Sequence, residues 1–265
     1  MLQVSELFIY PIKSLGGIAL QTAEITDRGL KHDRRWMLID NNNRFLSQRE
    51  FAQMALMKVT LEDDGLLVTY QPDGSTLKIP FSPQTDTEVD VVIWDDTCKA
   101  LLACPEADKW FSDHLNFNCR LVYMPDHCIR EVDSLYAKHK EVTSFSDGYP
   151  FLIIGQSSLD DLNSRLADKI TIDRFRPNIV FTGGAPYQED EMFQFSINNV
   201  VFYGVKRCAR CVVITIDQQT IIKNPAPTRA LASYRFQNNK IYFGQNLLHR
   251  GNGNINVGND VLIIS

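Results

Sequence analysis

Short runs of apolar and β-branched residues, separated by turn-forming residues, fill the first half of the chain. They predict strands at residues 4–10, 36–40, 66–71, 77–80 and 89–94. The three asparagines at 41–43 indicate a hairpin, and the Pro-Asp-Gly-Ser run at 72–75 indicates a turn between two of these strands. Many short strands with turns at this spacing favour a sandwich or a barrel.

Two helices are predicted in the middle of the chain. Residues 106–115 have apolar side chains at helical spacing, and the run from Ser157 places Leu159, Leu162 and Leu166 on one face. We expect serine to cap this second helix and acidic residues to fill its first turn. Strands return at 179–181, 200–205, 212–216, 240–243 and 259–264. The predicted fold class is mainly β with some helix (α+β), with a domain boundary near residue 120.

Length and charge narrow the class of protein. The 265 residues suffice for one large or two modest domains with a proper hydrophobic core. A formal net charge of −5 argues against general nucleic-acid binding, which needs a basic surface. Several cations nevertheless occur in tight clusters, and this pattern suits a small anionic ligand better than a polyanion.

The apolar runs and the cysteines indicate the cellular compartment in which the protein is expected. No apolar run is long enough for a bilayer span, and residues 1–6 have neither the basic nor the apolar part of a secretory signal. We therefore expect a cytoplasmic protein without a membrane partner and with reduced cysteines. The single cysteines at 98, 104, 119 and 128 are expected to be small buried or half-buried residues.

The sharpest local feature is the Lys-Arg-Cys-Ala-Arg-Cys run at 206–211. Positive neighbours favour thiolate over thiol, which makes a cysteine a nucleophile or a soft-metal ligand. A solvated basic turn with inert cysteines explains the spacing equally well, because one C-x-x-C pair is a weak signal. Structural zinc would need a second pair of ligands, which the sequence lacks. A thioredoxin-like dithiol would open a helix, whereas this pair precedes the predicted strand at 212–216.

Three further clusters could offer donors to an anion. The run at 10–17 ends a predicted strand and presents Lys13, Ser14 and two glycines. The runs Asp-Arg-Arg-Trp at 33–36 and Phe-Arg-Pro-Asn at 175–178 each place an arginine where a loop meets an apolar strand. A guanidinium fits phosphate oxygens. Taken alone, the first cluster is more often a plain turn, and each of the others could be a surface ion pair.

Together and in this order, these clusters resemble the MOSC family, which is named after the C-terminal domain of molybdenum cofactor sulfurases. The resemblance rests on the runs at 10–14, 33–36, 147–151, 162–166, 175–180 and 208–211. The chain is most similar to the group that contains the mitochondrial amidoxime-reducing component and its bacterial relatives. The resemblance implies an N-terminal β-barrel module at residues 1–120, packed against a β-barrel-like MOSC domain at 121–265.

The resemblance also implies a molybdenum cofactor (Mo-molybdopterin), in which a pterin dithiolene and one protein cysteine hold the metal. The second cysteine of the motif, Cys211, would be the metal ligand, and thiolate is a suitable soft donor. The other residues that the matching assigns to the cofactor are Lys13, Ser14 and Arg34 for the phosphate, Arg176 and Asn178 for phosphate or pterin, and Gly148, Tyr149, Ala209 and Arg210 along the pterin. Gly148-Tyr149 replaces a Thr-Ser pair of those relatives, and Asn246 replaces a tyrosine.

The implied function is molybdenum-dependent reduction of small N-hydroxylated compounds, with Cys211 at the metal and Asp147 as a proton donor. Some bacterial relatives append a ferredoxin domain, and this chain has no ferredoxin cysteine run. We therefore expect a separate electron-transfer protein of the ferredoxin or flavodoxin type. Two alternatives stay open. One is a persulfide sulfur carrier for cofactor or metal–sulfur cluster assembly through Cys211 or Cys208, and the other is non-catalytic storage or delivery of the cofactor.

Overall fold

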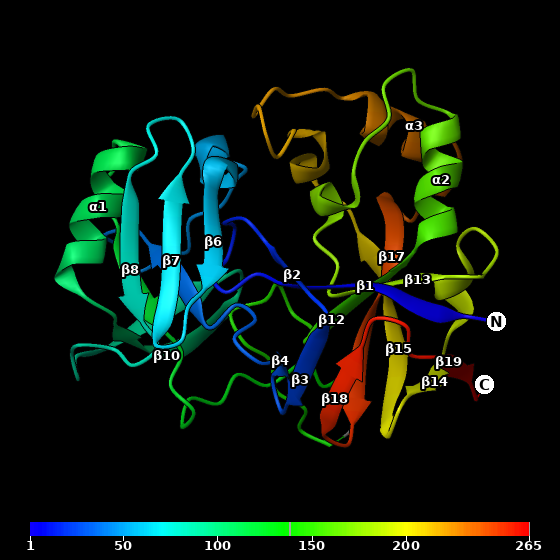
Figure 1. Cartoon of the computed structure of the whole chain (residues 1–265), viewed down its shortest axis with the longest axis horizontal. Helices are drawn as coiled ribbons and strands as arrows, with labels where there is room; N and C mark the ends of the chain where they lie inside the picture. Colours follow the sequence, from blue (N-terminus) through cyan, green and yellow to red (C-terminus); the bar gives the residue numbers. More distant parts are fainter. Residues whose placement is uncertain (138, 265) are drawn as a thin grey trace.

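The computed structural model, which describes residues 1–137 and 139–264, has two lobes. Strands β5 to β11 and helix α1 form the first lobe, and strands β12 to β19 with helices α2 and α3 belong to the second (Figure 1). The predicted fold class, mainly β with some helix, is confirmed.

Two small sheets and one helix build the first lobe. One sheet has the order β5-β11-β10-β9 and the other has the order β6-β7-β8. The elements are β5 (Trp36–Ile39), η1 (Ala52–Leu56), β6 (Met57–Leu61), β7 (Gly65–Tyr70), β8 (Thr76–Pro80), β9 (Glu88–Ile93), β10 (Asp96–Leu102), α1 (Pro105–Leu115) and β11 (Arg120–Tyr123).

Strand β5 is buried on both faces, which explains why all four of its residues are apolar. Trp36 and Leu38 belong to the core that also contains the inner faces of β6, β7, β8 and α1. Met37 and Ile39 point the opposite way, because side chains alternate along a strand, and they join a second core with Val91 of β9. Strand β11 likewise contributes Leu121 to the first core and Val122 to the second, so two short neighbouring strands connect the cores of this lobe.

The second lobe is built on a nine-stranded sheet with the order β19-β14-β15-β17-β12-β13-β1-β2, in which β16 also pairs with β17. Among the described residues, β12 and β13 are the only parallel neighbours on this path. Its strands are β1 (Gln3–Ile9), β2 (Ile18–Leu20), β12 (Phe151–Gly155), β13 (Ile179–Thr182), β14 (Gln194–Ile197), β15 (Val200–Ala209), β16 (Phe236–Gln237), β17 (Lys240–Arg250) and β19 (Val261–Ile263).

The large sheet closes on itself where the first and last strands meet. Gln3 forms a bridge with Asp260. The Val4 N–H donates to the Asn259 carbonyl at 2.8 Å, and the Val261 N–H donates to the Leu2 carbonyl at 2.9 Å. The second lobe is therefore barrel-like, and β1, from the start of the chain, is the strand that closes it.

Smaller elements cover the barrel. A three-stranded sheet joins β18 (Gly253–Asn256) to β3 (Thr22–Thr26) and β4 (Gly29–Leu30). Helices α2 (Gln156–Ser164) and α3 (Ala226–Arg235) lie at the same end of the lobe (Figure 1). The 3-10 turns are η2 (Ile172–Phe175), η3 (Gln188–Glu191) and η4 (Val212–Thr215). Within the described residues, no helix combines the length and apolar character that a membrane crossing requires.

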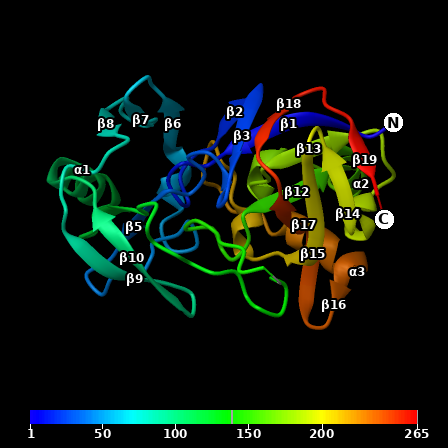
Figure 2. The same cartoon turned by 90° about the horizontal axis from the view of Figure 1, so that it is seen from below.

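The two lobes do not follow one another along the chain. Strands β1 to β4 pair only with one another or with strands of the second lobe, so the first lobe lies between β4 and β12 in sequence. Figure 2 shows the segment between β11 and β12 running from one lobe to the other. The boundary near residue 120 stays a prediction. The pairing adds that strands β1 to β4 belong structurally with the second lobe, whereas Ile12 and Leu15, between β1 and β2, pack in the core of the first lobe.

Most predicted elements are confirmed, including the β7–β8 hairpin, α1, and the burial of the four single cysteines. The strand predicted at 212–216 is wrong, because this segment is the 3-10 turn η4. Its bonds are local: the Ile216 N–H donates to the Val213 carbonyl at 3.0 Å, and Thr215 Oγ1 donates to the Val212 carbonyl at 2.7 Å. The β-branched residues of this segment, which favoured a strand in the sequence, therefore form a turn that pairs with no neighbouring strand among the residues described.

The serine cap and acidic first turn predicted for α2 are also wrong. The helix begins at Gln156 after Gly155, with no side-chain cap and no acid in its first turn. Ser158 Oγ instead donates to buried Glu189 at 2.8 Å and accepts from the Tyr187 N–H at 2.7 Å. The turn predicted at 41–43 is present, but the chain after it returns only as a single bridge between Ile39 and Phe45.

Candidate functional site

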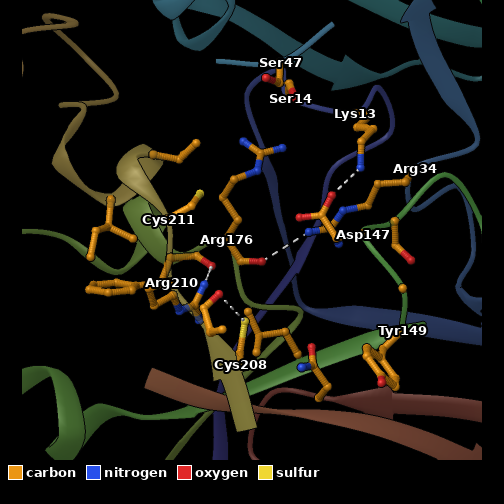
Figure 3. Close-up of a pocket in the computed structure, with 18 of the residues that line it drawn as sticks. Lys13, Ser14, Arg34, Ser47, Asp147, Tyr149, Arg176, Cys208, Arg210 and Cys211 are labelled. Atoms are coloured by element: carbon orange, nitrogen blue, oxygen red, sulfur yellow. Dashed lines mark hydrogen bonds and ion pairs between the residues drawn. The ribbon is translucent and has the colours of Figure 1, made fainter. Parts of the chain in front are cut away.

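One pocket, with a volume of about 290 Å³, lies between the two lobes. We call it the interlobe pocket (Figure 3). Every residue that the sequence assigned to cofactor binding or catalysis lines it: Lys13, Ser14, Arg34, Asp147, Gly148, Tyr149, Arg176, Asn178, Ala209, Arg210 and Cys211. Their roles stay predictions, but their convergence from distant segments is a property of the fold.

Irregular pairing in β15 presents the cysteine run to the pocket. Its register with β17 shifts between Gly204 and Lys206 and again between Arg207 and Ala209. A regular strand would point alternate side chains to opposite faces, whereas bulges change the direction of side chains. As a result, all six residues from 206 to 211 line the pocket.

The two cysteines of this run differ in exposure. Cys211, which lies between the end of β15 and η4, is exposed, whereas Cys208 is half-buried. Burial raises the pKa of the Cys208 thiol, although the nearby positive charges of Arg210 and Lys206 lower it. The sequence-based prediction of an activated thiolate is therefore wrong for Cys208. Both thiols line the pocket, and Cys211 is the more exposed of the two.

Three arginines of the pocket, Arg174, Arg176 and Arg210, carry buried guanidinium nitrogens that lack an acceptor in the described part of the chain. Arg210 donates through Nε to the Phe243 carbonyl at 2.8 Å and through Nη1 to the Phe175 carbonyl at 3.0 Å, and its Nη2 is unpartnered. Arg176 donates through Nη1 to the Leu15 carbonyl at 2.7 Å, and its Nη2 is likewise unpartnered. Buried donors normally have partners, so both atoms point to a missing acceptor.

Arg176 has a strained and desolvated position. Its backbone is left-handed, with φ of 55°, at the end of η2. Its guanidinium lies 4.2 Å from the Tyr10 ring centroid, and burial lowers the pKa of Arg176 to about 10. Figure 3 shows Arg176 between Cys211 on one side and the Lys13–Asp147 pair on the other. An anion in the pocket would therefore meet a partly desolvated cation near its middle.

Arg34 and Asn178 form a polar network beside β1. Arg34 Nη1 donates to Asp33 at 2.5 Å and to Asn178 Oδ1 at 3.2 Å. Asn178 Nδ2 donates to the Phe8 carbonyl at 3.2 Å, and the Leu152 N–H donates to its Oδ1 at 3.2 Å. Asn178 therefore uses its amide to join β1 with the start of β12 and to orient Arg34.

Lys13 and Asp147 form an ion pair with 2.6 Å between Nζ and Oδ1. Burial lowers the pKa of Lys13 to about 8, although the charge of Asp147 opposes this shift. Desolvation raises the pKa of Asp147, but the charge and hydrogen bond of Lys13, together with the Trp94 indole N–H, outweigh it and hold this pKa well below its usual range. An ionised carboxylate has no proton to give at neutral pH, so the prediction that Asp147 is a proton donor is not supported.

The segment that carries Asp147 and Gly148 is held from behind by Arg130, whose guanidinium is buried. Arg130 Nη1 donates to the Ser144 and Ser146 carbonyls at 2.8 and 2.6 Å. Its Nη2 donates to Asp96 at 2.7 Å. Asp96 opens β10 next to the turn that presents Trp94, so Arg130 orders two neighbouring parts of the pocket wall.

Sequence reasoning missed the first-lobe wall of the pocket, which consists of Phe45, Ser47, Gln48, Arg49 and Trp94. It also missed Arg130 and the pocket cation Arg174, which pairs with Asp217 at 2.6 Å. These residues belong to no spaced motif. The one signal in the sequence was the Asp95-Asp96 pair after the predicted strand at 89–94, and in the structure Trp94 adopts a left-handed backbone there, with φ of 56°.

Comparisons with known proteins agree with the arrangement of the chain. Family models match the MOSC N-terminal beta barrel domain at residues 1–118 and the MOSC domain at residues 140–262. Mitochondrial amidoxime-reducing component 1 of Mus musculus is 32% identical over 282 aligned positions, covering 98% of this chain and 82% of that protein. Mitochondrial amidoxime reducing component 2 of Bos taurus is 33% identical, covering 88% and 72%. Molybdenum cofactor sulfurase of Oryza sativa subsp. japonica is 27% identical, covering 92% of this chain and 32% of that protein.

Proposed function

The chain belongs to the MOSC family, and on that premise we propose that it is a molybdenum-cofactor-dependent oxidoreductase that reduces N-hydroxylated compounds. The names of the relatives, amidoxime-reducing components and a molybdenum cofactor sulfurase, support the cofactor and this class of reaction. The observation that carries the proposal is the exposed Cys211 thiol in one pocket with the unpartnered guanidinium nitrogens of Arg176 and Arg210.

The residues of the interlobe pocket fit such a cofactor. Cys211 would bind the metal, because an exposed thiolate is a soft donor. Lys13, Ser14, Arg34 and Arg176 would hold the phosphate, and the unpartnered Nη2 atoms of Arg176 and Arg210 would donate to anionic or carbonyl oxygens of the cofactor. When bound, the molybdenum cofactor supplies the two-electron redox centre for the reduction.

The overall reaction breaks the N–O bond of the substrate and releases its oxygen as water. It consumes two electrons from a separate electron-transfer protein, of the ferredoxin or flavodoxin type, and two protons from solvent. Lys13 Nζ, with a pKa of about 8, is protonated at neutral pH and is held by Asp147 Oδ1. In this proposal the charged Lys13 ammonium serves the cofactor phosphate, and Asp147 keeps it in place.

A reduced-dye assay on molybdenum-loaded protein tests the proposal with benzamidoxime as substrate. We expect amidine formation together with dye oxidation, in a ratio of two electrons per N–O bond. Cys211→Ala is expected to lose at least about 100-fold in activity, since removing even outer-sphere partners of a metal site costs roughly tenfold to 100-fold. Absence of amidine from protein with full molybdenum content would refute the reductase.

The alternative function, a persulfide carrier, draws on the same exposed thiol of Cys211. The raised pKa of Cys208 disfavours that residue as the carrier. Intact-protein mass spectrometry separates the two functions. A sulfur adduct on Cys211 in protein without molybdenum would favour the carrier, and molybdenum without an adduct would favour the reductase.

A further inference from the structure

Lys206 is a pocket cation that the cofactor assignment leaves unused. Most of the other cations around the interlobe pocket already have protein acceptors. Lys13, Arg34 and Arg174 form ion pairs, Arg207 donates to Gln237 and lies 3.8 Å from Asp190, and Arg176 and Arg210 donate to carbonyls. Lys206 Nζ forms neither a hydrogen bond nor an ion pair with any residue in 1–137 or 139–264. Among the pocket cations in these residues Arg49 shares this property, but it lies over the Trp94 ring of the first-lobe wall, 4.1 Å from the ring centroid.

Two aromatic rings hold the Lys206 ammonium without neutralising it. Its Nζ lies 4.5 Å from the Tyr136 ring centroid and 5.8 Å from that of Tyr149. A cation is attracted to the face of such a ring, but its full charge stays available to a ligand. Burial raises the pKa of Tyr149, so its phenol keeps its proton and can act as a hydrogen-bond donor beside the ammonium.

The backbone directs Lys206 toward the pocket. The register shift between Gly204 and Lys206 changes the direction of the side chain at the point where β15 reaches the pocket wall. The Asn246 side-chain amide fixes this irregular stretch by donating to the Lys206 carbonyl at 3.0 Å. At Gly204 an added Cβ would lie 2.2 Å from the Met192 carbonyl oxygen, so the bulge begins where only glycine fits.

Lys206 belongs to the end of the pocket away from the predicted phosphate site. Tyr149, one of its two rings, lies at the opposite end of Figure 3 from Ser14. Cys208, two residues further along the same strand, lies beside this end. Asp147, the carboxylate among the described residues that line the pocket, is already bound by Lys13 and Trp94. A free positive charge therefore faces the part of the pocket that the predicted phosphate ligands do not reach.

We propose that Lys206, held between Tyr136 and Tyr149, anchors an anionic group of the substrate, so that the pocket selects N-hydroxylated compounds that also carry a carboxylate. This proposal rests on the proposed reductase function and names its substrate class. The ammonium would contact the carboxylate directly, and the N–O group would be directed toward Cys211. Charge-assisted hydrogen bonds of this kind are about twice as strong as neutral ones.

The test compares two substrates that differ in one charge. Benzamidoxime and 4-carboxybenzamidoxime are assayed with reduced dye on molybdenum-loaded wild type, Lys206→Gln, Lys206→Arg and Lys109→Gln. Lys109 is an exposed residue of α1, outside the pocket lining, so its variant carries the same loss of charge elsewhere. We expect wild type to prefer the carboxylate by about tenfold in kcat/KM, mainly through KM.

The variants should distinguish a direct contact between Lys206 and the substrate carboxylate from a general effect of the protein's positive charge. Lys206→Gln is expected to lose most of the preference, Lys206→Arg to keep it, and Lys109→Gln to match wild type. The preference should also shrink as salt is raised, because exposed charge pairs are screened. Equal kcat/KM for both compounds in an active wild type would refute the proposal that Lys206 anchors a carboxylate, and the proposed reductase function would still stand.

A binding measurement keeps the proposal testable if neither compound turns over, which would count against the reductase. The unreactive probes 4-carboxybenzamide and benzamide are titrated calorimetrically into wild type and Lys206→Gln. Tighter binding of the carboxylate probe to wild type alone supports the anchor, and equal binding overturns it. Loss of molybdenum or pterin from Lys206→Gln would also overturn it, since Lys206 would then hold the cofactor.

Discussion

At Lys13, burial and a counter-ion act on one amine in opposite directions. Burial dominates and brings the pKa of Lys13 to about 8, even though Asp147 raises it. The protonated form is the one that attracts an anion, so binding should weaken as pH rises through this value. The affinity of this end of the pocket is thereby linked to pH in a range where an ordinary lysine would not titrate.

Sulfate binding tests this link, because the charge of sulfate is constant from pH 6 to pH 10. We expect the dissociation constant of cofactor-free wild type to rise above about pH 8, as Lys13 Nζ loses its proton. Lys13→Arg should remove the rise, since a guanidinium stays charged over this range. Isothermal titration calorimetry at several pH values makes the measurement, and an equally steep rise in Lys13→Arg would assign the titration elsewhere.

Residue identity could be predicted from sequence more readily than residue pairing. The clusters around Lys13, Arg34 and Arg176 were recognisable because each joins a cation to a strand end. The ion pair between Lys13 and Asp147 joins residues 134 positions apart, and no local pattern encodes it. The proton-donor role of Asp147 stays a prediction that its low pKa disfavours, and this low pKa comes from a partner that only the fold supplies.

At the scale of elements, a strand-like sequence pattern predicted a strand correctly where the segment pairs with a neighbouring strand, and wrongly where it does not. Alternating residues and a turn sufficed for the β7–β8 hairpin. The run at 212–216 has strand-forming residues but makes local turn bonds, because β15 has already ended at Ala209. The bulges in β15, which direct Lys206 and Cys208 to the pocket, leave no mark in the hydrophobic pattern.

The bulge at Gly204 should be sensitive to one methyl group. An added Cβ there would lie 2.2 Å from the Met192 carbonyl oxygen, so Gly204→Ala is expected to lower the free energy of unfolding by about 1–3 kcal/mol. Gly148→Ala is the matched control, since a Cβ at that position has no heavy atom within 4 Å. Urea denaturation of both variants gives the comparison, and equal stability would show that the strand accommodates the methyl group.

Arg130 should stabilise the segment that carries Asp147. Arg130→Met would leave the Ser144 and Ser146 carbonyls without their donor and Asp96 without its cation. We expect a loss of roughly 3 kcal/mol of unfolding free energy, allowing for the partial exposure of Asp96. Arg130→Lys should recover part of this loss. Thermal or urea unfolding makes the measurement, and wild-type stability in Arg130→Met would rule out the proposed clamp.

At the scale of the whole molecule, the pocket exists because the lobes are interleaved in sequence. β1 closes the barrel of the second lobe. In sequence, the elements of the first lobe follow β4, and the second lobe continues from β12. Gln48 and Gln218 exchange two side-chain hydrogen bonds of 3.0 Å across the lobes. Neither this pairing nor the first-lobe wall of the pocket could be predicted from sequence, because both depend on how the lobes pack.

X-ray absorption spectroscopy at the molybdenum edge tests the central claim most directly, because it counts the sulfur neighbours of the metal. The spectra of loaded wild type, Cys211→Ser and Cys208→Ser are compared. We predict that Cys211→Ser loses one sulfur neighbour and gains an oxygen, whereas Cys208→Ser matches wild type. An unchanged sulfur count in Cys211→Ser that still holds molybdenum would contradict the assignment of Cys211 as the metal ligand.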